Sequence, residues 1–207
     1  MKRKLFSGIA AVALVTISGL TPAAADAAKP GQSMTHIKTL PGITKVLESA
    51  GVILYAQGGA TSGVIGDSIA ADAGQVVIHA PITGTKSGVA HTGSNIVFFN
   101  TANDKSLVLR NPVIDLAAGT ITATIPQADN AKVAVLTITN GADLKAKVTN
   151  DRKAKLRTTV YPGAALSLAP GIAAAIVSLL GLPEGALPDG AAFATADVTI
   201  YSKIAGK

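Results

Sequence analysis

Few side chains in this sequence are suited to covalent or acid–base chemistry. The 207 residues contain three histidines, His36, His79 and His91, and no cysteine. A thiol nucleophile and a cysteine-based metal site are therefore excluded. Six of the twelve acidic residues stand beside asparagine or glycine, where aspartate commonly forms turns. These observations predict a protein that is not an enzyme and has no metal centre.

The basic residues are better organised than the acidic ones. Lys145 and Lys147 alternate with apolar residues, and Lys153, Lys155 and Arg157 alternate with small or apolar residues after a TNDR turn. Alternation with period two predicts a β-hairpin with apolar residues on one face and these cations on the other. Such a stripe is suited to contact with phosphate-bearing cell-wall polymers or lipid headgroups. The alternative is a solvated face whose lysines discourage edge-to-edge pairing of strands.

One longer stretch carries a family resemblance. Gly88–Ile125 contains a His-x-Gly before a strand, a Leu-x-Leu strand, an Asn-Pro turn and a Gly-Thr turn into an alternating strand. This stretch is similar to the central part of HtaA-type domains, exported bacterial β-domains known for haem binding. The resemblance implies that His91 lies near a haem and that Tyr55 ligates the iron, a role that suits an anionic tyrosinate. The alternatives are a histidine bonded to a turn and a tyrosine on an ordinary amphipathic strand.

The amino terminus has the three parts of a secretory signal peptide. Met1–Lys4 is basic, Leu5–Leu20 carries no charge, and small residues follow at Ala23–Ala25 and Ala25–Ala27. This pattern predicts a signal peptide, residues 1–27, that is cleaved after Ala25 or Ala27. The alternative is a membrane anchor, but the uncharged run is shorter than the roughly 20 residues that a spanning helix needs. We therefore expect a secreted or extracellular protein. Association with the cell wall is compatible with this location.

The composition of the chain without residues 1–27 limits the possible functions. The remaining 180 residues carry 15 basic and 11 acidic side chains, a net charge of +4. Aromatic residues make up 3% of the chain and tryptophan is absent, so bases of a nucleic acid would find few stacking partners. We expect no nucleic-acid binding and no membrane span in this part of the chain. The sequence does not indicate an oligomeric state.

Periodicity and turn residues predict the elements that position these side chains. Residues 28–40 are polar and are expected to form a linker, and residues 41–207 are expected to form a single domain. Two short helices are expected between proline and glycine, at Pro41–Gly51 and Pro170–Gly181. Val52–Pro162 is rich in β-branched residues with a turn about every ten residues, which is typical of sandwiches and barrels.

The sequence thus predicts an all-β protein, an antiparallel sandwich or open barrel with two short helices. Its expected function is that of an exported, non-catalytic binding or cell-surface-associated module without a cofactor. The partner would be an anionic cell-wall polymer. The alternative, from the family resemblance, is an HtaA-like haem-binding protein of haem uptake.

Overall fold

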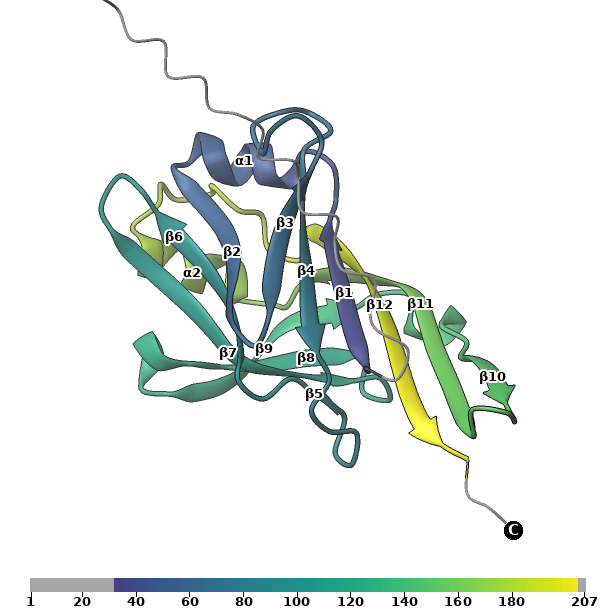
Figure 1. Cartoon of the computed structure of the whole chain (residues 1–207). Coiled ribbons are helices and arrows are strands. Elements are labelled where there is room, and N and C mark those ends of the chain that lie inside the picture. Colours follow the sequence, from purple (N-terminus) through teal and green to yellow (C-terminus); the bar gives the residue numbers. More distant parts are fainter. Residues whose placement is uncertain (1–31, 205–207) are drawn as a thin grey trace, which may run out of the picture.

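The computed structural model describes residues 32–204, and the predicted signal peptide lies outside them (Figure 1). Strands dominate, and two α-helices and two short 3-10 turns interrupt them. In chain order the elements are β1 (Met34–Thr39), α1 (Ile43–Ser49), β2 (Val52–Gly58), β3 (Thr61–Ile65), β4 (Gln75–Pro81), β5 (Val89–Ala90), β6 (Ser94–Asn100), β7 (Lys105–Asp115), β8 (Thr120–Ile125), η1 (Pro126–Ala128), β9 (Ala131–Ile138), η2 (Gly141–Asp143), β10 (Lys147–Asp151), β11 (Leu156–Leu168), α2 (Ile172–Leu180) and β12 (Ala192–Lys203).

The strands form one sheet that curls into a nearly closed barrel (Figure 1). Their order is β2-β6-β7-β8-β9-β11-β12-β1-β4-β3, while β10 pairs with β11 and β5 pairs with β7. The ladders between these strands are antiparallel. At the two ends of this order, β2 and β3 meet through a side chain, because Ala56 N–H donates to Ser62 Oγ at 3.1 Å. The predicted all-β fold with two helices is confirmed in its open-barrel form.

β1 lies in the middle of the sheet, between β12 and β4. The prediction of a linker over residues 28–40 is therefore wrong for Met34–Thr39. Two of the inward-facing side chains of this strand are threonines, Thr35 and Thr39, which are 0% and 1% exposed. Thr39 Oγ1 accepts a backbone N–H of β4 at 2.9 Å, so its burial leaves no unmet hydrogen bond. Because threonines occupy two inward positions of β1, the sequence of this segment lacks the apolar alternation that marks a strand.

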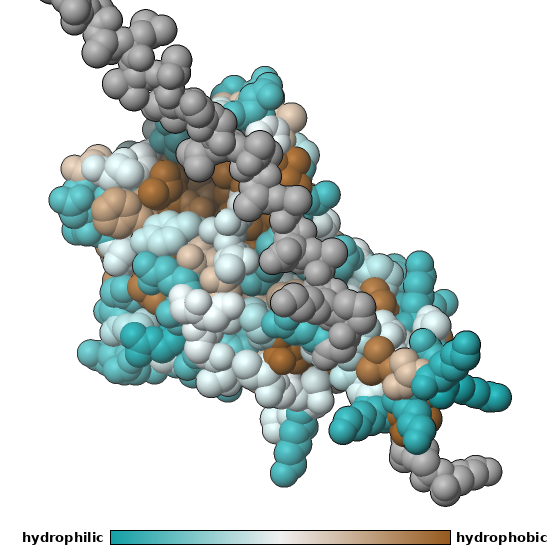
Figure 2. All heavy atoms as spheres, viewed as in Figure 1, coloured by the Kyte–Doolittle hydropathy of each residue, from teal (hydrophilic) through white to brown (hydrophobic). Residues whose placement is uncertain are grey.

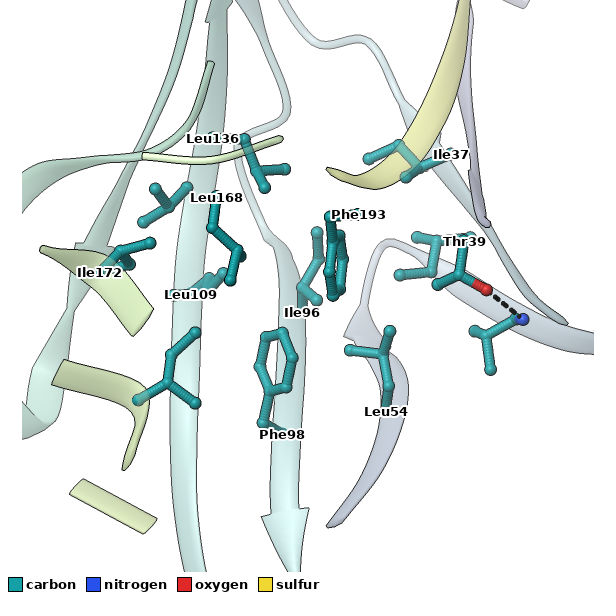
Figure 3. A pocket seen from close by; sticks show the side chains of 14 residues that line it. Ile37, Thr39, Leu54, Ile96, Phe98, Leu109, Leu136, Leu168, Ile172 and Phe193 are labelled. Carbon is teal, nitrogen blue, oxygen red and sulfur yellow. Dashed lines mark hydrogen bonds between the residues drawn. The ribbon is translucent and has the colours of Figure 1, made fainter. Parts of the chain in front are cut away.

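Alternating apolar side chains fill the barrel. In β8 the residues Ile121, Ala123 and Ile125 are 3%, 0% and 3% exposed, as the period-two pattern predicts. Figure 3 shows side chains from several strands meeting in the centre, where the ring centroids of Phe98 and Phe193 are 6.1 Å apart. Two interior voids of about 20 Å³ each remain. A void of this size holds about one water molecule.

Both helices end next to the glycine that predicted their end in the sequence. Gly51 follows α1 with φ 76°, and Gly181 follows α2 with φ 66°. Only glycine adopts this left-handed conformation at little cost, which lets the chain turn back at the end of each helix.

α2 covers part of the barrel core, as its uncharged sequence predicts. Ile172 and Ile176 line the interior and are 6% and 2% exposed. A helix that carries no charge is expected to be buried on most sides. That expectation is wrong for one face of α2, where Ala174 and Ser178 are exposed.

Three strands continue beyond the barrel as a projection that we call the tongue, residues 147–160 and 199–203. It consists of β10, the first half of β11 and the end of β12, paired side by side. Figure 1 shows it at the lower right, with β10 at its outer edge. A bulge in β11 marks its base, where Gly163 N–H donates to Asp197 Oδ1 at 2.7 Å.

Candidate functional site

His91 is a buried structural residue. It is 1% exposed, and burial lowers its pKa, while a backbone hydrogen bond raises it. Nδ1 lies 3.0 Å from the carbonyl oxygen of Pro112, and Nε2 lies 2.8 Å from Thr35 Oγ1. Because a carbonyl oxygen can only accept, Nδ1 carries the proton of the neutral ring, and Nε2 accepts from the threonine hydroxyl. The imidazole therefore joins β1 to β7 and has no nitrogen left for an external ligand.

Tyr55 lies on the opposite face of the sheet from His91. Leu54 precedes it and points into the core, where it lines the same interior region as Phe98 (Figure 3). Since successive residues of a strand point to opposite faces, Tyr55 points outward, where its hydroxyl accepts from Gln57 Nε2 at 3.4 Å. The structure therefore does not bring these two side chains together. The interior voids of about 20 Å³ in the described part of the chain are also far too small for a porphyrin.

A hairpin forms here, but its turn spans residues 152–155 instead of the predicted 149–152, and its cations do not lie on one face. Lys147 pairs with Val160, and Asn150 pairs with Arg157. Residues directly opposite each other in a ladder share a face, whereas positions an odd number apart along one strand do not. Lys147 and Arg157 consequently point to opposite faces of the tongue, and the prediction of a single stripe is wrong.

The other three predicted cations lie outside the paired strands. Lys145 precedes β10, while Lys153 and Lys155 lie in the turn between β10 and β11. Asp151 Oδ1 accepts the backbone N–H of Ala154 at 2.9 Å, and Lys155 has a left-handed φ of 52°. The turn therefore holds cations at the tip of the tongue, and the strands hold others on both of its faces.

Charge is unevenly divided between the tongue and the rest of the described chain. The tongue carries six basic side chains and one acidic side chain, net +5. The other residues of 32–204 carry seven basic and ten acidic side chains, net −3. Within residues 32–204 the only ion pair joins Lys45 to Asp72 on the barrel, so no described carboxylate pairs with a tongue cation. Figure 2 shows the long hydrophilic side chains of the tongue extending at the lower right.

The tongue also exposes apolar surface. Val148 is 55% exposed and shares a face with its ladder neighbours Thr159 and Ile200. On the other face, Tyr201 and Leu156 are half-buried. Apolar groups beside unpaired cations make the tongue an amphipathic surface.

A second polar cluster, which the sequence analysis missed, lies on the outer face of the barrel. His36 of β1 and His79 of β4 are direct ladder partners. Their Nδ1 atoms are 2.6 Å apart, and their rings meet edge to face at 86°. Thr35 and Ile37, which flank His36, are buried inward, so the histidine points outward.

Asp197 of β12 is the ladder partner of His36 on its other side, so the row crosses three adjacent strands. Burial lowers the pKa of His36, and the neighbouring His79 lowers it further, whereas Asp197 raises it. His36 is therefore neutral at pH 7, and the hydrogen bond between the two Nδ1 atoms requires one proton in total. No local pattern could reveal this pair, because 43 positions separate the two histidines and the first lies in the segment predicted as a linker.

A groove of about 280 Å³ runs along the exposed face of α2. Ala174, Val177 and Leu187 form its apolar wall, and Glu184 and Asp189 add two carboxylates. Asp189 Oδ1 accepts a backbone N–H at the start of α2, at 2.9 Å. One of the two acids thus already has a structural role.

Comparisons of the chain with protein-family models, with curated proteins and with solved structures found no match. Among the helices of residues 32–204, none has both the length and the apolar character that a membrane crossing requires.

Proposed function

We propose that this protein is an exported, non-catalytic module that binds a phosphate-bearing anionic polymer of the cell surface through the tongue. The observation that carries the proposal is the division of charge, net +5 on the tongue and net −3 on the rest of the described chain. Four of the five cations singled out in the sequence belong to the tongue, and the fifth, Lys145, lies two residues before β10.

The physical argument rests on the exposure of the tongue cations and on their lack of a carboxylate partner within residues 32–204. Tongue cations such as Lys147, Lys153 and Arg157 are exposed, so they keep their hydration until a ligand approaches. A basic side chain near an anionic surface contributes about 1 kcal/mol at moderate ionic strength. Several such side chains on one small projection therefore support useful affinity, while the negative barrel orients the molecule with its tongue toward the polymer.

The non-catalytic part of the proposal rests on the histidines. Both ring nitrogens of His91 are engaged within the core, and His36 and His79 contact each other. Haem uptake, the alternative raised by the sequence, gains no support from the positions of Tyr55 and His91. A visible absorption spectrum after addition of haem tests that alternative directly.

Two matched variants test the role of the tongue. The tongue variant changes Lys147, Arg152, Lys153 and Lys155 to Gln, and the barrel variant makes the same change at four exposed lysines elsewhere. Those four are Lys38, Lys86, Lys105 and Lys132. Both variants lose four positive charges, so net charge alone cannot distinguish them.

Binding is measured by co-sedimentation with purified cell wall, before and after removal of its phosphate-bearing polymers. The tongue variant should bind at least about tenfold more weakly than the parent, given about 1 kcal/mol per cation, and the barrel variant should bind about as well as the parent. Raising the salt to 1 M should reproduce the loss, because the Debye length then falls to about 3 Å. Equal binding by both variants would refute the proposal. Tongue-dependent binding to anionic vesicles without binding to wall would identify lipid headgroups instead.

A further inference from the structure

We propose that His36 and His79 bind one divalent transition-metal ion on the outer face of the barrel, with Cu²⁺ preferred. This site lies outside the tongue and does not depend on the proposed polymer binding. The two imidazoles come from neighbouring strands and present their Nδ1 atoms to each other at 2.6 Å. An ion placed between them would replace the single hydrogen bond that they now share.

The distance between the nitrogens favours one coordination geometry. With metal–nitrogen bonds of about 2.0–2.1 Å, two ligands at a right angle are separated by about 2.9 Å, and two tetrahedral ligands by about 3.3 Å. The two Nδ1 atoms now lie 2.6 Å apart. They therefore need to move less to reach the right-angle arrangement than to reach the tetrahedral one. Tetragonal geometry is typical of Cu²⁺ and Ni²⁺, and the general order of affinities places Cu²⁺ first.

The surroundings of the pair permit this movement. His79 Nε2 has no hydrogen-bond partner within the described structure, so a small rotation of the ring breaks no second hydrogen bond. Metal binding requires neutral imidazoles, and the edge-to-face contact of the two rings presents a nitrogen of each to the space between them. Asp197, the ladder partner of His36, adds negative charge close to the ion.

The coordination shell would be completed from outside the protein. Within residues 32–204, no three or more His, Cys, Asp or Glu side chains are arranged to hold a metal ion. The pair therefore supplies two ligands, and water occupies the remaining positions. Because His79 Nε2 lacks the usual acceptor, we expect an affinity about 10- to 100-fold below that of a site with anchored ligands.

The site is tested by titrating the full folded chain with Cu²⁺ at pH 7.5. Calorimetry measures the affinity and the stoichiometry, and electron paramagnetic resonance counts the nitrogen ligands. The expected result is one Cu²⁺ per chain with two equatorial nitrogens in the spectrum. His36→Gln and His79→Gln should each weaken binding at least tenfold and remove one nitrogen from the spectrum. Asp197→Asn should weaken binding a few-fold and leave the nitrogen count unchanged.

Lys38→Gln is the matched control, because Lys38 is an exposed residue on the same strand and face as His36. This variant should bind Cu²⁺ at least as well as the parent, and so should the tongue variant. An unchanged copper spectrum in both histidine variants would place the ion elsewhere and overturn the proposal. Failure of the folded parent to bind Cu²⁺, or tighter binding of Zn²⁺ than of Cu²⁺, would also overturn it.

Discussion

The barrel and the tongue are built from the same continuous strands but differ in almost every physical property. In the barrel, β12 buries Ala196 and Val198, which are 2% and 0% exposed. A few residues further on, the same strand enters the tongue and ends in Ser202 and Lys203, which are exposed. Core packing therefore stops at the bulge near Gly163, and strand pairing alone continues.

This difference separates stability from recognition. Burial of apolar surface is the dominant favourable contribution to folding, and the barrel contains nearly all of it. The tongue can therefore carry unpaired cations and exposed Val148 without weakening the core. Substitutions in the barrel should change the free energy of unfolding, and substitutions in the tongue should change binding.

The largest loss of stability is expected from a substitution in α2, the helix that covers part of the core. Ile176→Asp places a carboxylate among apolar side chains and removes an isoleucine that is 2% exposed. The free energy of unfolding should fall by about 3–5 kcal/mol, measured by urea denaturation. Ser178→Asp, on the exposed face of the same helix, should change it by less than about 0.5 kcal/mol. Similar stability of the two variants would show that α2 is peripheral.

A pair of valines compares the two regions with identical chemistry. Val198 is 0% exposed in the barrel, and Val148 is 55% exposed in the tongue. Val198→Ala should cost about 2 kcal/mol, from two lost methyl groups and the cavity they leave. Val148→Ala should cost less than about 0.5 kcal/mol. Equal losses in thermal or urea denaturation would mean that the tongue has a packed core of its own.

The smallest effect is a dependence of barrel stability on pH. The pKa values of His36 and His91 lie below the ordinary value of 6.5 because both rings are buried. The unfolded chain therefore takes up these protons at a higher pH than the folded chain. Stability is complete above about pH 6.5 and falls as the pH decreases below it, by at most about 1.4 kcal/mol per pH unit for each histidine.

His91→Gln should reduce this slope, besides lowering stability at pH 7 by about 1–3 kcal/mol through the lost buried hydrogen bonds. The tongue variant should keep the slope of the parent, because it removes neither histidine. Urea denaturation between pH 5 and 8 measures both slopes. A slope in His91→Gln equal to that of the parent would contradict the assignment of the titration to the barrel core.

Local patterns in the sequence were sufficient to predict many of the strands and helix ends. Alternation in β8 predicted which residues are buried, and Gly51 and Gly181 marked the ends of both helices, because their backbone conformation is a local property. Two alternating runs predicted a hairpin at β10 and β11, although they placed its turn at residues 149–152 instead of 152–155. The family resemblance, in contrast, named Tyr55 and His91 as one site, and the sheet places them on opposite faces.

What the sequence by itself determined is therefore the β-rich class, the helix ends and the hairpin, since each depends on residues close together in the chain. Only the tertiary structure decided which segments are neighbours. It placed Met34–Thr39 in the centre of the sheet and His36 beside His79, and it gave His91 its bond to Thr35. It also divided Lys147 and Arg157 between two faces, because a strand's faces are defined by its register with a partner. Register depends on turns, bulges and distant partners, which the local period of two does not encode.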